Sequence, residues 1–221
     1  MLYKADRDVQ MADVKICGIR DEKALQAAVE AGVRHIGFVF YPDSPRYIKP
    51  DQAKVLAEAT PKSVRRVGLF VDPGSEGLEK ILGTVELDMI QLHGDESPER
   101  VTEIKQKFGK PVMKALKIAT KYDMEGLEDY EAAADWLLFD SKSADAEMPG
   151  GTGQSFDWSV LKDRTFQKPW MLSGGLNHEN VSDALSLLNP KVVDVSSGVE
   201  SEPGVKDPDK IREFVNIARN Q

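Results

Sequence analysis

The chain has 221 residues, of which 41% are hydrophobic and 30% charged, an ordinary balance for one globular domain of this length. Its formal net charge of -8 argues against a nucleic-acid partner, because a negative protein repels phosphate backbones. The single cysteine, Cys17, favours a reducing, cytoplasmic location, and no apolar run approaches the length of a membrane span, so no membrane partner is expected.

A short apolar stretch followed by an amphipathic stretch recurs along the chain, beginning after residue 12. We therefore expect residues 1–12 to be an N-terminal extension and residues 13–221 to form a single domain. The apolar stretches are often β-branched, as expected for strands buried on both faces. The predicted strands are Val14–Cys17, Ile36–Phe40, Val67–Val71, Met89–Leu92, Val112–Leu116, Leu137–Phe139, Trp170–Leu172 and Val192–Val195. The predicted helices span residues 21–31, 50–59, 75–82, 98–108, 124–133, 157–161, 178–188 and 208–219.

Eight strand–helix units in one chain predict an α/β fold with parallel strands. Such a repeat is compatible with a doubly wound sheet or a closed barrel, and eight complete units favour a single-domain (β/α)8 TIM barrel. Asp21, Ser97 and Asn177 each stand just before an amphipathic stretch, where they are expected to cap a helix. In such a barrel the catalytic groups lie where the strands end and the following loops begin.

The first and last predicted strands carry polar groups on the face that points into the barrel. Side chains alternate along a strand, so Lys15 and Cys17 share a face opposite the apolar Val14. Cys17 stands at the end of its strand, where it is either a reactive thiol or a small buried hydrophobe. Asp194 in the eighth strand should also face inward, where it can form a buried ion pair with Lys15.

Two other strands also end in groups that can move protons. Asp140 ends the sixth strand and should face inward, where a carboxyl group can donate or accept a proton, although a loop or capping aspartate is the alternative. Gln91 and His93 share a face of the fourth strand, and His93 either contacts a substrate or is an internal hydrogen-bonded histidine. The other two histidines stand elsewhere in the repeat, so no metal site is expected.

Glycine-containing loops follow the seventh and eighth strands, and these are the loops that frequently bind phosphate in barrels. Glycine lets backbone N–H groups approach an anion closely, although ordinary turn glycines are the alternative. The predicted phosphate-binding residues are Gly174, Gly175, Ser196, Ser197 and Gly198.

Two further loops complete the predicted site. The loop after the second strand contains two prolines that stiffen it beside Arg46, whose planar guanidinium suits a carboxylate, although a lone arginine is more often a solvated surface charge. The long loop after the sixth strand contains Pro149–Gly153 and is either a lid or a disordered surface loop. The predicted substrate-binding residues are Arg46, Gln91, His93, Gly153 and Asp194.

Motifs along almost the whole chain after residue 12 resemble those of the phosphoribosylanthranilate isomerase family. They are KICGIRD (15–21), GFVFYPDSPRYI (37–48), VGLFVD (67–72), IQLHGDE (90–96), LLFDSK (137–142), GGTGQSFDW (150–158), SGGLN (173–177) and DVSSGVE (194–200). The combination of KICG in the first strand with DVSSGVE in the eighth is characteristic of this family rather than of phosphate-binding barrels in general.

The resemblance implies an intramolecular aldose–ketose isomerase of tryptophan biosynthesis that uses no cofactor and no metal. The implied reaction is an Amadori rearrangement of N-(5-phosphoribosyl)anthranilate to 1-(2-carboxyphenylamino)-1-deoxyribulose 5-phosphate. It implies that Asp140 is the general acid, Cys17 the general base and Arg46 the contact for the substrate carboxylate. This phosphorylated small molecule is the expected partner, and the chain is expected to act as a monomer or homodimer.

Two other enzymatic activities and one non-catalytic function fit the sequence less well. A barrel that isomerises the histidine-pathway aminoaldose uses two aspartates at the tops of strands one and five, whereas strand one here ends in Cys17 and VMKALK (112–117) has no aspartate. A metal-dependent sugar-phosphate epimerase needs converging His and Asp ligands, which these strand ends do not offer. A non-catalytic ligand-binding barrel would not need both Cys17 and Asp140 beside two phosphate loops.

Overall fold

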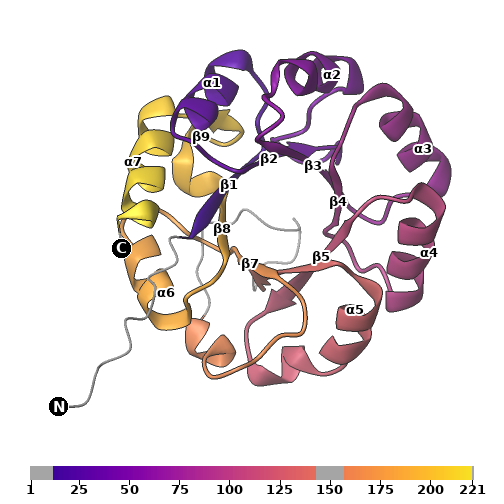
Figure 1. Cartoon of the computed structure of the whole chain (residues 1–221), viewed down its shortest axis with the longest axis vertical. Helices are drawn as coiled ribbons and strands as arrows, with labels where there is room; N and C mark the ends of the chain where they lie inside the picture. The colour runs from indigo at the N-terminus through magenta and orange to yellow at the C-terminus, as the bar shows by residue number, and fades with distance from the viewer. Residues whose placement is uncertain (1–11, 143–156, 221) are drawn as a thin grey trace.

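The computed structural model describes residues 12–142 and 157–220, and it contains a closed barrel of strands (Figure 1). Neighbouring barrel strands are parallel, and β1 pairs with both β2 and β8 to close the ring. The predicted (β/α)8 barrel is therefore confirmed. The barrel strands are β1 (Asp13–Cys17), β2 (His35–Val39), β3 (Arg65–Phe70), β4 (Met89–Leu92), β5 (Val112–Ile118), β6 (Trp136–Ser141), β7 (Trp170–Leu172) and β8 (Val192–Val195).

Helices surround the barrel on its outer side, and the first and last of them, α1 and α7, lie side by side (Figure 1). Arg219 in α7 donates to the carbonyl oxygen of Ala31 at 3.1 Å, which ties the end of the domain to its beginning. No helix in the described ranges is long and apolar enough to cross a membrane. The α-helices are α1 (Glu22–Glu30), α2 (Pro50–Ala59), α3 (Ser75–Thr84), α4 (Pro98–Phe108), α5 (Leu127–Ala133), α6 (Val181–Leu188) and α7 (Pro208–Arg219). Short 3-10 helices are η1 (Lys121–Met124), η2 (Trp158–Leu161) and η3 (Ser197–Val199).

Two elements differ from those expected from the sequence. The helix predicted over residues 124–133 is divided into η1 and α5, because Gly126 between them has a φ of 73°, in the left-handed region that favours glycine. An antiparallel hairpin of β9 (Glu200–Glu202) and β10 (Val205–Lys206) follows β8 and was not predicted. This hairpin lies beside the end of β1 (Figure 1) and brings two charged side chains to the site.

Two of the three predicted caps are confirmed at the helix they precede. The side chain of Asp21 accepts from the N–H of Ala24, and that of Ser97 accepts from the N–H of Arg100. The third helix begins later than expected, at Val181. Asn177 instead caps the turn before it.

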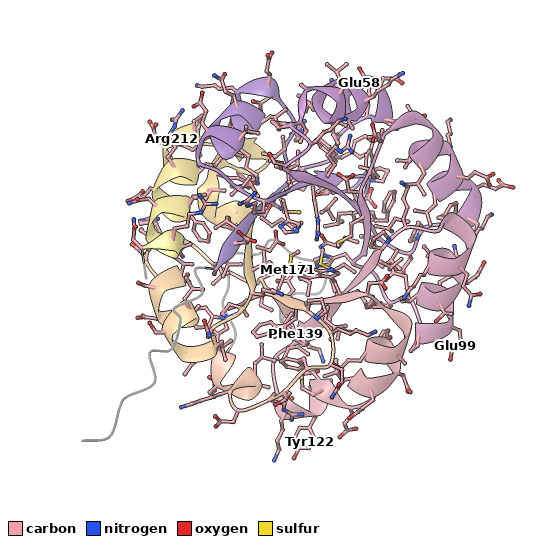
Figure 2. The ribbon with its side chains drawn as sticks, in the orientation of Figure 1. Glu58, Glu99, Tyr122, Phe139, Met171 and Arg212 are labelled. Carbon is pink, nitrogen blue, oxygen red and sulfur yellow. The ribbon has the colours of Figure 1, made fainter. Side chains whose placement is uncertain are left out.

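Strand alternation divides the buried residues into two layers. The outer layer packs between strands and helices and includes Val14, Ile16 and Phe139. Figure 2 shows Met171 inside the ring of strands and Phe139 on its outer side. The inner apolar layer fills the part of the barrel nearer the strand N-termini, so polar groups at the C-terminal strand ends can face a cavity. Its buried members are Val67, Met89, Met113, Ala115, Leu138, Met171 and Val192.

Candidate active site

A cavity lies at the C-terminal ends of the barrel strands. The inward orientations predicted for Cys17, Asp140 and Asp194 are confirmed, because all three side chains line it. The sequence prediction missed the contributions of Tyr41 and Ser44, which come from the loop after β2. The described residues that line the cavity are Cys17, Val39, Tyr41, Ser44, Arg46, Leu69, Val71, His93, Asp140, Ser173, Asp194 and Ser196.

Two hydrogen bonds hold the carboxyl group of Asp140. Its Oδ2 lies 3.0 Å from Nε2 of His93, and its Oδ1 accepts from the N–H of Ser141 at 2.8 Å. On the other side of the imidazole, Nδ1 of His93 lies 2.9 Å from the amide nitrogen of Gln91. An amide nitrogen only donates, so this arrangement assigns the proton of His93 to Nε2, which donates to Asp140. Gln91 lies behind His93 and orients it, and of these two residues only His93 lines the cavity.

The thiol of Cys17 is buried, with 4% of the residue exposed. Burial raises the pKa of this thiol above its usual value, and Lys15 opposes that rise. Gly37 lies opposite Cys17 in the pairing of β1 with β2, and a Cβ on this glycine would stand only 2.9 Å from the Cys17 sulfur. The backbone carbonyl of Cys17 accepts from the hydroxyl of Ser196 at 3.0 Å, which links β1 to the loop after β8.

The predicted ion pair inside the barrel is confirmed. Nζ of Lys15 lies 2.9 Å from Oδ1 of Asp194, and the two side chains are 0% and 4% exposed. The hydroxyl of Ser173 donates to the other oxygen of Asp194 at 3.4 Å. Asp194 therefore faces the cavity while it is bound to a cation from the neighbouring strand.

The guanidinium of Arg46 is bound by Glu200, a pairing that the sequence prediction missed. Nε and Nη2 of Arg46 each donate to one carboxylate oxygen of Glu200 at 2.8 Å. Lys206 from β10 also donates to this carboxylate, at 2.5 Å. Burial would raise the pKa of Glu200, but Arg46 and Lys206 together outweigh burial and the pKa is lowered. The planar fork of Arg46 is thus engaged inside the protein, and Nη1 forms no hydrogen bond with the described residues.

The loops after β7 and β8 touch one another through glycine. A Cβ on Gly198 would lie 2.0 Å from the carbonyl oxygen of Leu176, and a Cβ on Gly174 would lie 2.4 Å from the backbone nitrogen of Ser141. Gly174 and Gly175 also have φ angles of 86° and 65°. Their N–H groups form no backbone hydrogen bond within the described ranges, so both donors are available to an anion. Gly153, predicted to bind substrate, lies outside the described residues.

A thiol and a carboxyl group that face one cavity at the strand ends of a closed barrel define an acid–base enzyme of the β/α-barrel class. The family model for N-(5'-phosphoribosyl)anthranilate (PRA) isomerase matches residues 14–217. The chain therefore belongs to this family of isomerases, and the resemblance drawn from its motifs is confirmed.

Relatives and solved structures agree with this assignment. The chain is 53% identical over 203 residues to the N-(5'-phosphoribosyl)anthranilate isomerase of Paracoccus denitrificans, covering 91% of this chain and 94% of the relative. A crystal structure of phosphoribosyl anthranilate isomerase from Thermotoga maritima has a TM-score of 0.85 at 39% identity, covering 96% of this chain and 100% of its own.

Two further structures of phosphoribosylanthranilate isomerases each have a TM-score of 0.82 at 38% identity, with the same coverage. One is of monomers generated from the dimeric Thermotoga maritima enzyme, and the other is a complex with reduced 1-(o-carboxyphenylamino)-1-deoxyribulose 5-phosphate.

Proposed function

We propose that this chain catalyses the Amadori rearrangement of N-(5'-phosphoribosyl)anthranilate to 1-(2-carboxyphenylamino)-1-deoxyribulose 5-phosphate in tryptophan biosynthesis. The observation that carries the proposal is that Cys17 of β1 and Asp140 of β6 face one cavity from non-adjacent strands. Membership of the isomerase family supports it, as does the neighbour in complex with a reduced form of this product. The iminium ion formed during the reaction is itself an electron sink, so the proposed chemistry needs neither cofactor nor metal.

In this proposal Asp140 is the general acid and Cys17 the general base. Asp140 gives a proton to the furanose ring oxygen as the bond from that oxygen to carbon 1 breaks, which leaves an iminium ion. The thiolate of Cys17 then removes the proton from carbon 2, and the electrons of that C–H bond form the double bond of an enolamine. The enolamine tautomerises to the ketone. Acid and base act on different atoms, which is why they come from different strands.

The two groups must begin with the opposite of their ordinary protonation states. A free cysteine has a pKa of about 8.5 and a free aspartate about 3.9, so near neutral pH the unperturbed acid is ionised and the unperturbed base is protonated. We propose that Cys17 and Asp140 share a single proton in the active form. The pH profile of kcat/KM should then be bell-shaped, with limbs that belong to the pair rather than to either residue.

The substrate's two anionic groups are proposed to bind at two separate anchors. The phosphate binds to backbone N–H groups of the loops after β7 and β8, at Gly174, Gly175, Ser197 and Gly198, next to Ser196, the one predicted phosphate-binding residue that lines the cavity. The anthranilate carboxylate binds to Nη1 of Arg46, whose Nε and Nη2 each donate to Glu200. Two fixed anchors place the reacting carbons between acid and base.

The proposal is tested with purified protein and freshly prepared phosphoribosylanthranilate, by following the change in anthranilate fluorescence. Cys17→Ala and Asp140→Asn should each reduce turnover by at least about 100-fold, the lower end for acid–base groups. KM should change much less, because both anchors remain. Near-normal turnover of either variant at every pH tested would show that the assignment of base and acid is wrong.

We further propose a cytoplasmic location and a monomeric or homodimeric state. The single cysteine supports a reducing, cytoplasmic location. The dimeric enzyme of Thermotoga maritima supports a homodimer, and the monomers generated from it support a monomer that folds by itself. Light scattering over a range of protein concentrations distinguishes the two states of this chain.

A further inference from the structure

A fully buried lysine lies directly beneath the thiol of the cavity. Lys15 and Cys17 are two residues apart on β1 and both face the inside of the barrel. On the neighbouring strand β2, Gly37 has no side chain, and the space next to it is occupied by the Cys17 thiol and the Lys15 ammonium. A Cβ at Gly37 would stand 2.9 Å from the sulfur of Cys17 and 3.4 Å from Nζ of Lys15. The ammonium is therefore a close neighbour of the sulfur, with no side chain of β2 at that point.

The ion pair with Asp194 keeps this lysine charged. Burial alone would lower the pKa of Lys15, but Asp194 and the nearby Cys17 outweigh burial and the pKa is raised. The carboxylate lies 2.9 Å from Nζ and is itself held by Ser173 at 3.4 Å. Lys15 thus carries a positive charge near neutral pH, and its side chain is fully buried inside the barrel. Charges interact more strongly there than at the surface.

We propose that the Lys15 ammonium stabilises the thiolate of Cys17 and so sets the fraction of Cys17 that can act as a base. The inference rests on the proposed function, in which Cys17 removes the proton from carbon 2. Lys15 does not touch the substrate in this scheme and is a positioning residue that acts through Cys17. Before the reaction, the positive charge of Lys15 balances the negative charge of the thiolate. The thiolate becomes neutral when it accepts the proton from carbon 2.

The other charged groups around Cys17 do not replace Lys15 in this role. Lys206 also favours the thiolate, but more weakly than Lys15, and its Nζ is bound to Glu200 at 2.5 Å and to the carbonyl and hydroxyl oxygens of Ser196 at 3.1 Å. Asp194 disfavours the thiolate. The remaining titratable or charged groups that line the cavity with Cys17 are Tyr41, Arg46, His93 and Asp140.

The test measures ionisation of Cys17 directly, in the absence of substrate. Cys17 is the chain's single cysteine, so the ultraviolet absorbance of its thiolate, with Cys17→Ser as the blank, reports this one group. In Lys15→Met, which replaces the lysine with an unbranched, uncharged side chain one atom shorter, the thiol should ionise at a pH higher by about one unit, a tenfold loss of thiolate at a given pH. The limb of the kcat/KM profile that reports thiolate formation should shift in the same direction, while KM stays nearly unchanged.

Lys15→Met leaves the Asp194 carboxylate buried without a partner, which can destabilise the fold. The double variant Lys15→Met/Asp194→Asn removes both charges together and should still ionise Cys17 at a pH above that of the wild type, because Lys15 dominates the pair at the sulfur. Lys114→Met is the matched control. Lys114 is also a buried strand lysine, paired with Glu96 at 2.6 Å, but on β5 and outside the cavity lining, so Cys17 should ionise as in the wild type.

Unchanged ionisation of Cys17 in both Lys15 variants would overturn the proposal. An equal shift in Lys114→Met would also overturn it, because the effect would then belong to the loss of any buried lysine. Neither outcome bears on the base itself, which is tested separately by the turnover of Cys17→Ala. Failure of this inference and failure of the proposed function can therefore be distinguished.

Discussion

The contact between the two glycine loops allows the phosphate anchor to be perturbed without touching the acid–base pair. In Gly198→Ala the new Cβ would stand 2.0 Å from the carbonyl oxygen of Leu176 and 3.0 Å from Cα of Asn177. Both neighbours are backbone atoms, so rotation of a side chain cannot relieve the overlap. Because Cβ contacts under 3.0 Å are essentially never seen, the loops after β7 and β8 must separate by about 1 Å.

The size of the effect follows from this displacement. A misplacement of about 1 Å in a group that positions the substrate can reduce the rate by about 100-fold. We therefore expect kcat/KM of Gly198→Ala to fall by about 100-fold, which is about 2.7 kcal/mol of lost transition-state stabilisation. Overpacking should also lower the free energy of unfolding by about 1–3 kcal/mol. Inorganic phosphate, which should compete with substrate for the same N–H groups, should inhibit the variant only weakly.

Steady-state kinetics with phosphoribosylanthranilate, with and without inorganic phosphate, measures these effects. Gly74→Ala is the matched control. The Gly74 φ of -69° suits any residue, and a Cβ there meets nothing within 4 Å, so its kinetics should equal those of the wild type. Circular dichroism establishes that each variant is folded. A folded Gly198→Ala protein with wild-type kcat/KM and competitive phosphate inhibition would refute the placement of the phosphate.

Two further predictions concern Arg46 and His35. Arg46→Ala should weaken binding of a product analogue by about 1.5–3 kcal/mol, the scale of a charged hydrogen bond. Arg46→Lys should recover only part of this binding energy, because lysine lacks the planar fork. Unchanged affinity of Arg46→Ala in calorimetric titration would exclude Arg46 from the site. Burial, with Arg65 and Lys15, lowers the pKa of His35 to about 3, so below about pH 6.5 the unfolded chain binds a proton that the folded chain does not. The free energy of unfolding should therefore fall as the pH drops from about 6.5 toward 3, by up to about 1.4 kcal/mol per unit. Urea unfolding of His35→Leu should show a weaker pH dependence than the wild type, and equal dependence would mean that folded His35 takes up the proton.

The positions of the acid and the base could be predicted from the sequence because they depend on short-range rules. Alternation of side chains along a strand places Cys17 inward once Val14 and Ile16 are recognised as outward-facing, and both do pack in the outer layer. Asp140 follows the same rule in β6. The rule needs only the strand's own residues and the closure of the barrel, and eight strand–helix units indicate that closure.

The surroundings of Arg46 could not be predicted in the same way. Its partner Glu200 is 154 residues away in sequence and belongs to a hairpin of three and two residues, too short for a pattern of alternation to reveal. The division of the helix at Gly126 had a local signal, the glycine itself, but a glycine inside an amphipathic stretch is also tolerated within helices. What was missed is therefore of two kinds, contacts between distant segments and local signals with more than one reading.

The ion pairs around the cavity explain why an anionic substrate is proposed to bind through backbone groups at its phosphate end. Within the described part of the chain, Arg46 is the single lysine or arginine that lines the cavity, and Glu200 already holds two of its nitrogen atoms. Lys15 and Lys206 are each bound to a buried carboxylate. The charged side chains near the cavity are therefore largely neutralised by partners within the protein. The donors that remain for an anion are mainly the backbone N–H groups of the glycine loops. Such donors favour an anion without adding a mobile charge near Cys17, whose ionisation can then be governed by Lys15 beneath it.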